Sequence, residues 1–276
     1  MTSVSEKLSD HSDVSGDLSS FFNNIRIVLV RTSHPGNIGS AARAMKTMGL
    51  SRLYLVNPEV GINEESVALS AGASDVLENA VICSSLGEAL AGTDLSVASS
   101  ARRRSIEREP MDPRNMGETV AGFVREGRCV AVVFGCERTG LTNEEIDLCD
   151  CHVTIDADSG YSSLNLAMAV QVLCYEIRTS CIGVCKSGAD DFPERTSLRF
   201  HEKQALADGM DLEGFYQHLS SVLTETGFLH ENNKGGILRK IKRIFTRPYL
   251  TKDDINILRG ILTSVTRTIK ETRDNL

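Results

Sequence analysis

The chain has 276 residues, of which 41% are hydrophobic and 24% are charged, and only 6 are proline. No apolar run reaches the length of about 18 residues that a membrane-spanning helix needs, so we expect a soluble globular protein. The first residues lack a basic segment followed by an apolar one, which argues against a secretory signal and favours a cytoplasmic location. The length suits a core domain with a small appendage.

The 8 cysteines fit a reducing compartment. They occur singly in apolar runs or within "CDC" and "CIGVC", and none has the C-x-x-C spacing of a zinc site. We therefore expect free thiols and no metal.

The net charge of −7 would repel a polyanion at long range, but the positive charges are unevenly distributed. A basic segment without acidic residues runs from Lys234 to Arg247, and a second basic stretch, "RRRSIER", runs from Arg102 to Arg108. One such run is usually a solvated surface. Two of them in an acidic protein favour phosphate binding.

Short β-branched runs alternate with helical patterns after a Ser- and Asp-rich tail, residues 1–20, which we expect to be disordered. Alternation of this kind predicts an α/β fold with a parallel sheet covered on both faces. The predicted strands cover residues 25–30, 53–56, 95–99, 130–134 and 152–156, and the predicted helices cover 40–48, 85–91, 117–126, 142–148 and 164–175.

The α/β pattern occupies residues 21–182 and ends at a stretch rich in Gly, Pro and charge, which predicts a linker over 183–197. Two amphipathic helices, 209–224 and 253–269, lie on either side of the basic segment. The sequence therefore predicts a small all-α C-terminal domain, residues 198–276.

The first predicted strand runs into "RTSHPGNIGSAARAMKTMG", a Gly-containing strand-to-helix loop of the kind that binds phosphate. It contains neither the dinucleotide-binding glycine fingerprint nor a P-loop. An ordinary tight turn, with Arg43 facing solvent from the helix that follows, remains an alternative on these residues alone.

The stretch "FGCERTGLTNEEID" follows the fourth predicted strand. Gly135 and Gly140 allow backbone to approach a ligand closely, and "TNEE" predicts a helix capped by Thr142 with Glu145 in the capping box. Glu137, in the intervening loop, could simply pair with its neighbour Arg138.

Four predicted strands are followed by small or polar residues, namely Gly36, Ser99, Gly135 and Ser162. The carboxyl ends of parallel strands meet at one edge of a sheet, where α/β proteins bind ligands. One ligand site is therefore expected rather than four unrelated loops.

Three motifs, "NIGSAAR", "FGCERTGL" and "YSSLNLAMAV", resemble in order and spacing those of the SpoU/TrmH branch of the SPOUT RNA methyltransferases. "LSAGASDV", "GFLHEN" and "INILRGIL" extend the resemblance to the tRNA cytidine/uridine ribose methyltransferases of the TrmJ type. The resemblance implies a SPOUT fold with a C-terminal trefoil knot, and a homodimer with the active site at or near the subunit interface. Such a knot would bury the helix beginning at "SSLN", which is apolar on nearly every side.

The resemblance also implies methyl transfer from S-adenosylmethionine to a ribose 2′-hydroxyl. A guanidinium keeps its proton at neutral pH, so we expect Arg43 to clamp an adjacent phosphate rather than to act as a base. The implied catalytic residues are Asn37, Arg43, Glu137, Ser163 and Asn165, and the implied cofactor-binding residues are Ser99, Ser100, Ala101, Gly135, Ile155, Ser162, Ser163 and Leu164.

The implied substrate is the first pyrimidine of the tRNA anticodon loop, nucleotide thirty-two (C or U). Ribosomal RNA as the substrate, or a non-catalytic RNA-binding protein of the same fold, are the alternatives. Arg31 departs from the family, in which an acidic residue is expected there. The residues expected to bind RNA are Arg102, Arg104, Lys234, Arg239, Lys240, Lys242, Arg243 and Arg247.

Overall fold

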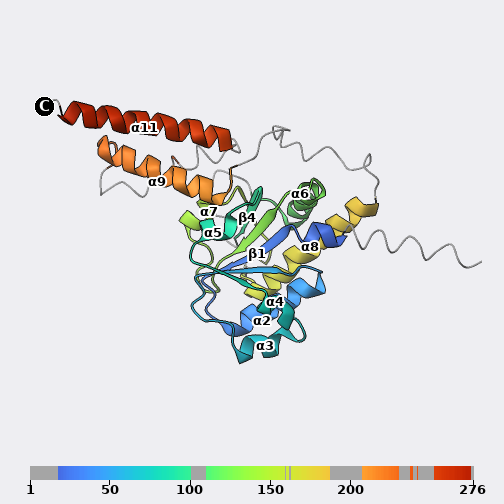
Figure 1. Ribbon diagram of the computed structural model, residues 1–276. Coiled ribbons are helices and arrows are strands. Elements are labelled where there is room, and N and C mark those ends of the chain that lie inside the picture. The colour runs from blue at the N-terminus through green and yellow to red at the C-terminus, as the bar shows by residue number, and fades with distance from the viewer. Residues whose placement is uncertain are drawn as a thin grey trace, which may run out of the picture.

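The computed structural model describes residues 18–100, 110–158, 160–161, 163–186, 207–229, 237–238, 241 and 252–274. Its centre is a six-stranded sheet in the order β3-β2-β1-β5-β4-β6 (Figure 1). Every pairing is parallel, which confirms the predicted sheet type. The strands are β1 (Ile25–Val30), β2 (Arg52–Val56), β3 (Val81–Cys83), β4 (Leu95–Ser99), β5 (Val130–Phe134) and β6 (Cys151–Val153).

Helices connect the strands and cover both faces of the sheet, as expected of parallel strands. The two longest connecting helices begin earlier than the sequence predicts because Pro35 and Pro113 occupy their first turns, where a missing N–H costs nothing. The helices are α2 (Pro35–Thr47), α3 (Glu64–Ser70), α4 (Ser74–Glu78), α5 (Leu86–Leu90), α6 (Pro113–Arg125), α7 (Asn143–Asp147) and α8 (Leu166–Lys186).

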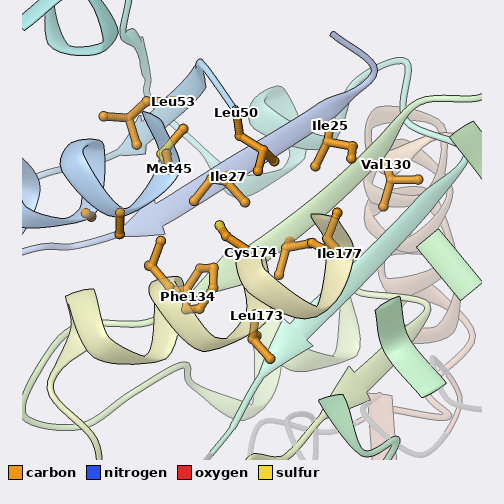
Figure 2. Close-up of a cluster of buried hydrophobic side chains, with 14 of the residues drawn as sticks. Ile25, Ile27, Met45, Leu50, Leu53, Val130, Phe134, Leu173, Cys174 and Ile177 are labelled. Carbon is orange, nitrogen blue, oxygen red and sulfur yellow. The ribbon is translucent and has the colours of Figure 1, made fainter. Parts of the chain in front are cut away.

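The alternation of side chains along β1 shows how the two faces are filled. Ile25 and Ile27 join the larger hydrophobic cluster, to which α2, α6 and α8 contribute, whereas Val28 and Val30 join a smaller cluster with α5 and α7. Figure 2 shows the larger cluster, with Cys174 and other α8 side chains facing the strands. Each fully buried large aliphatic side chain contributes about 1.5–3 kcal/mol of transfer free energy, so these two clusters hold the layers together.

Helix α8 is long and apolar enough, by length and composition, to span a membrane, with a mean hydropathy of 1.2. In the structure it is a core helix that packs against α6 and α2. Its polar groups are matched to those neighbours, since Glu176 pairs with Arg114 at 3.3 Å and Arg178 Nη1 donates to the Met48 carbonyl at 3.0 Å.

Several boundaries differ from the prediction. The last strand of the sheet is Cys151–Val153 rather than 152–156, and α8 reaches Lys186, into the predicted linker. Residues 18–22, partly assigned to the tail, form a helical segment whose Phe22 is buried against the core. The rest of the predicted tail, residues 1–17, lies outside the described residues.

The C-terminal part is helical, as predicted. Helices α9 (Gly209–Glu225) and α11 (Lys252–Asp274) pack together through a separate cluster that includes Phe215 and Ile255. The first turn of α9 lies on α5, and Asp208 Oδ2 accepts a hydrogen bond from Gly92 N at 2.7 Å. Figure 1 shows the two helices projecting from the α5 side of the sheet.

Candidate active site

A cavity of about 300 Å³ lies where the chain leaves β4 and β5 and enters α8. Its volume is at the lower end of the range for small-molecule sites. Six of the eight residues expected to bind the cofactor line it, which brings together three separate segments. These six are Ser99, Ser100, Gly135, Ile155, Ser163 and Leu164. Ala101 and Ser162 lie outside the described residues.

The loop after β5 forms one wall of the cavity, from Gly135 to Leu141. It folds back on itself, because Gly140 N donates to the Cys136 carbonyl at 2.9 Å and Gly140 has a left-handed φ of 67°. A Cβ at Gly135 would lie only 2.1 Å from the Gly140 carbonyl carbon and from Leu141 N. Glycine at 135 is therefore required for this wall to exist in its present shape.

Glu137 in this wall is the centre of a hydrogen-bond cluster that reaches the loop after β1. Its Oε2 accepts from Ser33 N at 3.1 Å and Ser33 Oγ at 3.0 Å, and its Oε1 accepts from His34 N at 3.3 Å and Asn37 Nδ2 at 2.9 Å. The pairing of Glu137 with Arg138 that the sequence allowed is not seen, since Arg138 lies 3.9 Å from Glu59 instead.

These donors determine the charge on Glu137. Burial raises the pKa of its carboxyl, but hydrogen bonds from Asn37, from its own backbone and from Ser33 outweigh burial and hold the pKa below its usual value. Glu137 is therefore ionised at neutral pH and accepts four hydrogen bonds, which makes it an anchor for Asn37 rather than a proton donor.

Asn165 connects this cluster to the start of α8. Its Nδ2 donates to Asn37 Oδ1 at 3.0 Å, while its Oδ1 accepts from Ala167 N at 2.9 Å. Asn165 thus has two roles: it satisfies a backbone N–H in the first turn of α8, and it joins α8 to the loop after β1. Ser163 lies two residues earlier and lines the cavity.

Arg43 is placed apart from the other predicted catalytic residues. It is exposed on α2, about 9 Å along the helix and about 120° around it from Asn37. It is not among the residues lining the cavity, and within the described chain its guanidinium has no hydrogen-bond or ion-pair partner. The eight residues expected to bind RNA, from Arg102 to Arg247, fall outside the residues described.

Two features, one beside the cavity wall and one in it, were not predicted. Arg31 has a left-handed φ of 52° and forms an ion pair with Glu145 at 2.8 Å. Cys136 lines the cavity; burial raises the pKa of its thiol, but hydrogen bonds involving Thr139 and the nearby Arg31 charge bring the pKa below its usual value. The position of Arg31 directly after the first strand, at the ligand-binding edge, was the available signal.

Family models match both parts of the chain. Residues 24–175 match the SpoU rRNA Methylase family, and residues 210–274 match the C-terminal domain of the tRNA methyltransferase TrmJ. Similar proteins include the tRNA (cytidine/uridine-2′-O-)-methyltransferase TrmJ of Pectobacterium atrosepticum, 49% identical over 90% of this chain and 99% of that protein. TrmJ of Escherichia coli K12 is 51% identical over 88% of this chain and 95% of that protein.

Solved structures agree with the sequence relatives. TrmJ from Z. mobilis ZM4 superposes with a TM-score of 0.74 at 29% identity, covering 87% of this chain and 98% of that one. A probable methylase family protein from Haemophilus influenzae gives a TM-score of 0.55 at 40% identity, with 90% and 98% of the two chains covered. The parallel sheet, the cavity at its carboxyl edge and these relatives lead to one conclusion: the chain belongs to the SpoU methylase family.

Proposed function

We propose that the protein methylates the ribose 2′-hydroxyl of the first anticodon-loop pyrimidine of tRNA, nucleotide thirty-two. The relatives at 49% and 51% identity are named as tRNA cytidine/uridine 2′-O-methyltransferases, which supports tRNA and the ribose oxygen. The structural observation that carries the proposal is the hydrogen-bonded line from Glu137 through Asn37 to Asn165, beside a cavity of cofactor size.

S-adenosylmethionine is the cofactor, and the residues present fit it. Phe134, Ile155 and Leu166 offer apolar surface for an adenine ring, while Ser99 and Ser163 offer hydroxyl groups for ribose and carboxylate oxygens. When bound, the cofactor supplies a sulfonium methyl group, an electrophile. Ser99, Ser100, Gly135, Ile155, Ser163 and Leu164 would hold it.

Positioning of the ribose falls to Asn165 and Ser163. An amide nitrogen carries two hydrogens, of which Asn37 takes one from Asn165 Nδ2, so the second can donate to a ribose oxygen. Glu137 fixes the orientation of Asn37, which fixes that of Asn165. Glu137 is therefore a positioning residue, and holding the hydroxyl in line with the methyl is the main contribution of this cluster.

Arg43 would clamp the phosphate next to the reacting ribose. Its exposure, and its distance from the cavity of its own chain, favour action on the cavity of a second copy. Met168 and Tyr175 leave large apolar surfaces exposed on α8, and their spacing of seven residues puts them on one face. This face supports a homodimer with the active site at or near the interface.

The remaining expectations concern the knot, tRNA binding and location. The segment before α8 lies close to the loop after β5, since Ser163 and Leu164 line one cavity with Gly135, and this proximity is compatible with the trefoil knot that we propose. The two-domain division with a helical domain at 198–276 is kept, but the first domain, expected at 21–182, is extended to residues 18–186 because α8 continues to Lys186. Helices α9 and α11 would be the core of a tRNA-binding domain. A tRNA substrate supports a cytoplasmic location.

Transfer of labelled methyl from S-adenosylmethionine to unmodified tRNA transcripts, followed by mapping of the ribose, tests the proposal. Wild type should label one pyrimidine at nucleotide thirty-two. Arg43→Ala and Asn165→Ala should each lose at least tenfold in kcat/KM, since each removes a group that orients the reacting ribose. Lys46→Ala is the matched control, because Lys46 is an exposed cation three residues beyond Arg43 on α2.

Three results would contradict the proposal in different ways. Methyl label on ribosomal RNA alone would show that ribosomal RNA, and not tRNA, is the substrate. Label on tRNA at another nucleotide would refute the anticodon-loop assignment. Cofactor binding without transfer to any RNA would make the protein a binding module.

A further inference from the structure

Arg31 joins β1 to the cavity wall although it does not line the cavity. It follows the last residue of β1, and its backbone N–H donates to the Val56 carbonyl at 2.8 Å. A left-handed φ is uncommon for a residue other than glycine, yet Arg31 adopts one, with φ at 52°. Such a conformation needs support from side-chain contacts, and Arg31 has them.

The Arg31 guanidinium binds Glu145 through two hydrogen bonds. Nε donates to Oε1 at 3.0 Å and Nη2 donates to Oε2 at 2.8 Å, the fork arrangement that only arginine offers a carboxylate. The side chains are 31% and 16% exposed, so solvent screens the pair less than it screens a surface ion pair. Nη2 also lies 3.4 Å from the Gly140 carbonyl oxygen.

Glu145 transmits this contact to the end of the wall. Its Oε2 accepts from Thr142 N at 2.7 Å, and Thr142 Oγ1 accepts from Glu145 N, which completes the capping box of α7. Arg31 thus holds the two residues that terminate the loop, Gly140 directly and Thr142 through Glu145. At the other end of the loop, the Gly135 backbone lies against that of Gly140, since a Cβ added at Gly135 would be only 2.1 Å from the Gly140 carbonyl carbon.

We propose that Arg31 is a positioning residue for the cofactor: it sets the affinity for S-adenosylmethionine by holding the wall from Gly135 to Leu141 through Glu145 and Gly140. The proposal rests on the cofactor site of the proposed function, and it assigns a use to a side chain that touches neither cofactor nor RNA. Loss of the two Arg31–Glu145 hydrogen bonds allows the wall to adopt other conformations. The fraction of molecules whose wall can bind the cofactor then falls, and the apparent affinity falls by the same factor.

Calorimetric titration with S-adenosylmethionine tests the proposal on the full chain. Arg31→Ala should raise the cofactor Kd at least tenfold, about 1.4 kcal/mol, while KM for tRNA stays within twofold. Arg31→Lys should recover part of the affinity, since one ammonium can reach one carboxylate oxygen but cannot form the fork. Glu145→Gln keeps an oxygen for Thr142 N but removes the charge, and should also raise Kd.

A double variant tests whether Arg31 and Glu145 affect cofactor affinity through the same interaction. Arg31→Ala with Glu145→Gln should be no worse than Arg31→Ala alone, whereas independent contributions would multiply. Lys46→Ala is the matched control, because Lys46 likewise ties a carboxylate, Asp75, and a glycine carbonyl, Gly72, and lies outside the cavity. Its cofactor Kd should not change.

The proposal is wrong if a folded Arg31→Ala protein binds the cofactor within twofold of wild type, or if the two substitutions multiply. Should Arg31→Ala not fold, Arg31→Lys and Glu145→Gln decide in the same way. Wild type that binds the cofactor but methylates no tRNA would refute the proposed function and leave this inference testable by binding alone. Wild type that binds no cofactor would refute both.

Discussion

Substitution of Gly135 by alanine perturbs the cavity wall at its most crowded point. The new Cβ would lie 2.1 Å from the Gly140 carbonyl carbon and from Leu141 N, both of them backbone atoms. An ordinary carbon–carbon contact needs roughly 3.5 Å, so the two ends of the loop must separate by roughly 1.4 Å. A displacement of this size shifts the cavity wall formed by residues Gly135 to Leu141 relative to Ser99 and Leu164 on the other side of the cavity.

Overpacking of this kind costs about 1–3 kcal/mol. We expect Gly135→Ala to lower the thermal unfolding midpoint and to raise the Kd for S-adenosylmethionine at least tenfold, measured by differential scanning fluorimetry and calorimetry. Gly122→Ala is the matched control. Gly122 lies in α6, and a Cβ added there would meet nothing within 4 Å. Alanine at this helical position should therefore stabilise the protein by about 0.5–1 kcal/mol and leave the cofactor affinity unchanged. If Gly135→Ala retains wild-type affinity and stability, the described shape of the wall is wrong.

Four further predictions follow from the described contacts. Glu137→Gln should destabilise the protein by about 1–2 kcal/mol at neutral pH, after allowance for solvent screening. Because folding lowers the pKa of Glu137, this difference in unfolding free energy should be complete above about pH 4.3 and should vanish as the pH falls through the folded-state pKa. A difference in urea unfolding that does not depend on pH would contradict this. Iodoacetamide should modify Cys136 before Cys174, because burial raises the pKa of Cys174 to about 12, and bound cofactor should protect Cys136. Equal rates of modification of the two thiols, measured by mass spectrometry, would contradict the placement of Cys136 in the cavity wall. Gly209→Ala, whose Cβ would lie 2.5 Å from Leu90 Cβ, should shift α9 on α5 and raise KM for tRNA without changing cofactor Kd; an unchanged KM would separate this contact from tRNA binding. Arg43→Ala co-refolded with Gly135→Ala should be assayed at S-adenosylmethionine concentrations far below the raised Kd of Gly135→Ala; activity should rise above that of either variant, up to about a quarter of wild type, if Arg43 serves the partner's cavity, and should not rise if it serves its own.

The sequence predicts the sheet well where strands are central and poorly at its edge. The five predicted strands correspond to observed ones, because β-branched runs buried on both faces leave a continuous apolar signal. Strand β3 was missed: it has three residues, and Val81 and Ile82 are 42% and 57% exposed at the sheet edge. Helices α3 and α4, of seven and five residues, were missed as well.

The site follows from topology more than from any single motif. The strand order places β5 between β1 and β4, so the loops after these three strands meet, as their shared position predicts. Motif residues Asn37, Glu137 and Asn165 therefore become neighbours although they are far apart in the chain. No local pattern indicates the partner of Arg31, because Glu145 lies 114 residues further along the chain. The two residues meet only when the loop after β5 folds back toward β1.

The measurement that tests the central claim most directly is the structure of the protein with S-adenosylhomocysteine and a tRNA anticodon stem-loop. We expect the nucleoside between Ser99 and the wall that begins at Gly135, with a ribose 2′-oxygen beside Asn165 and a phosphate bound by Arg43 from the second copy of the chain. Cofactor bound elsewhere, or an RNA ribose far from Asn165, would contradict this claim.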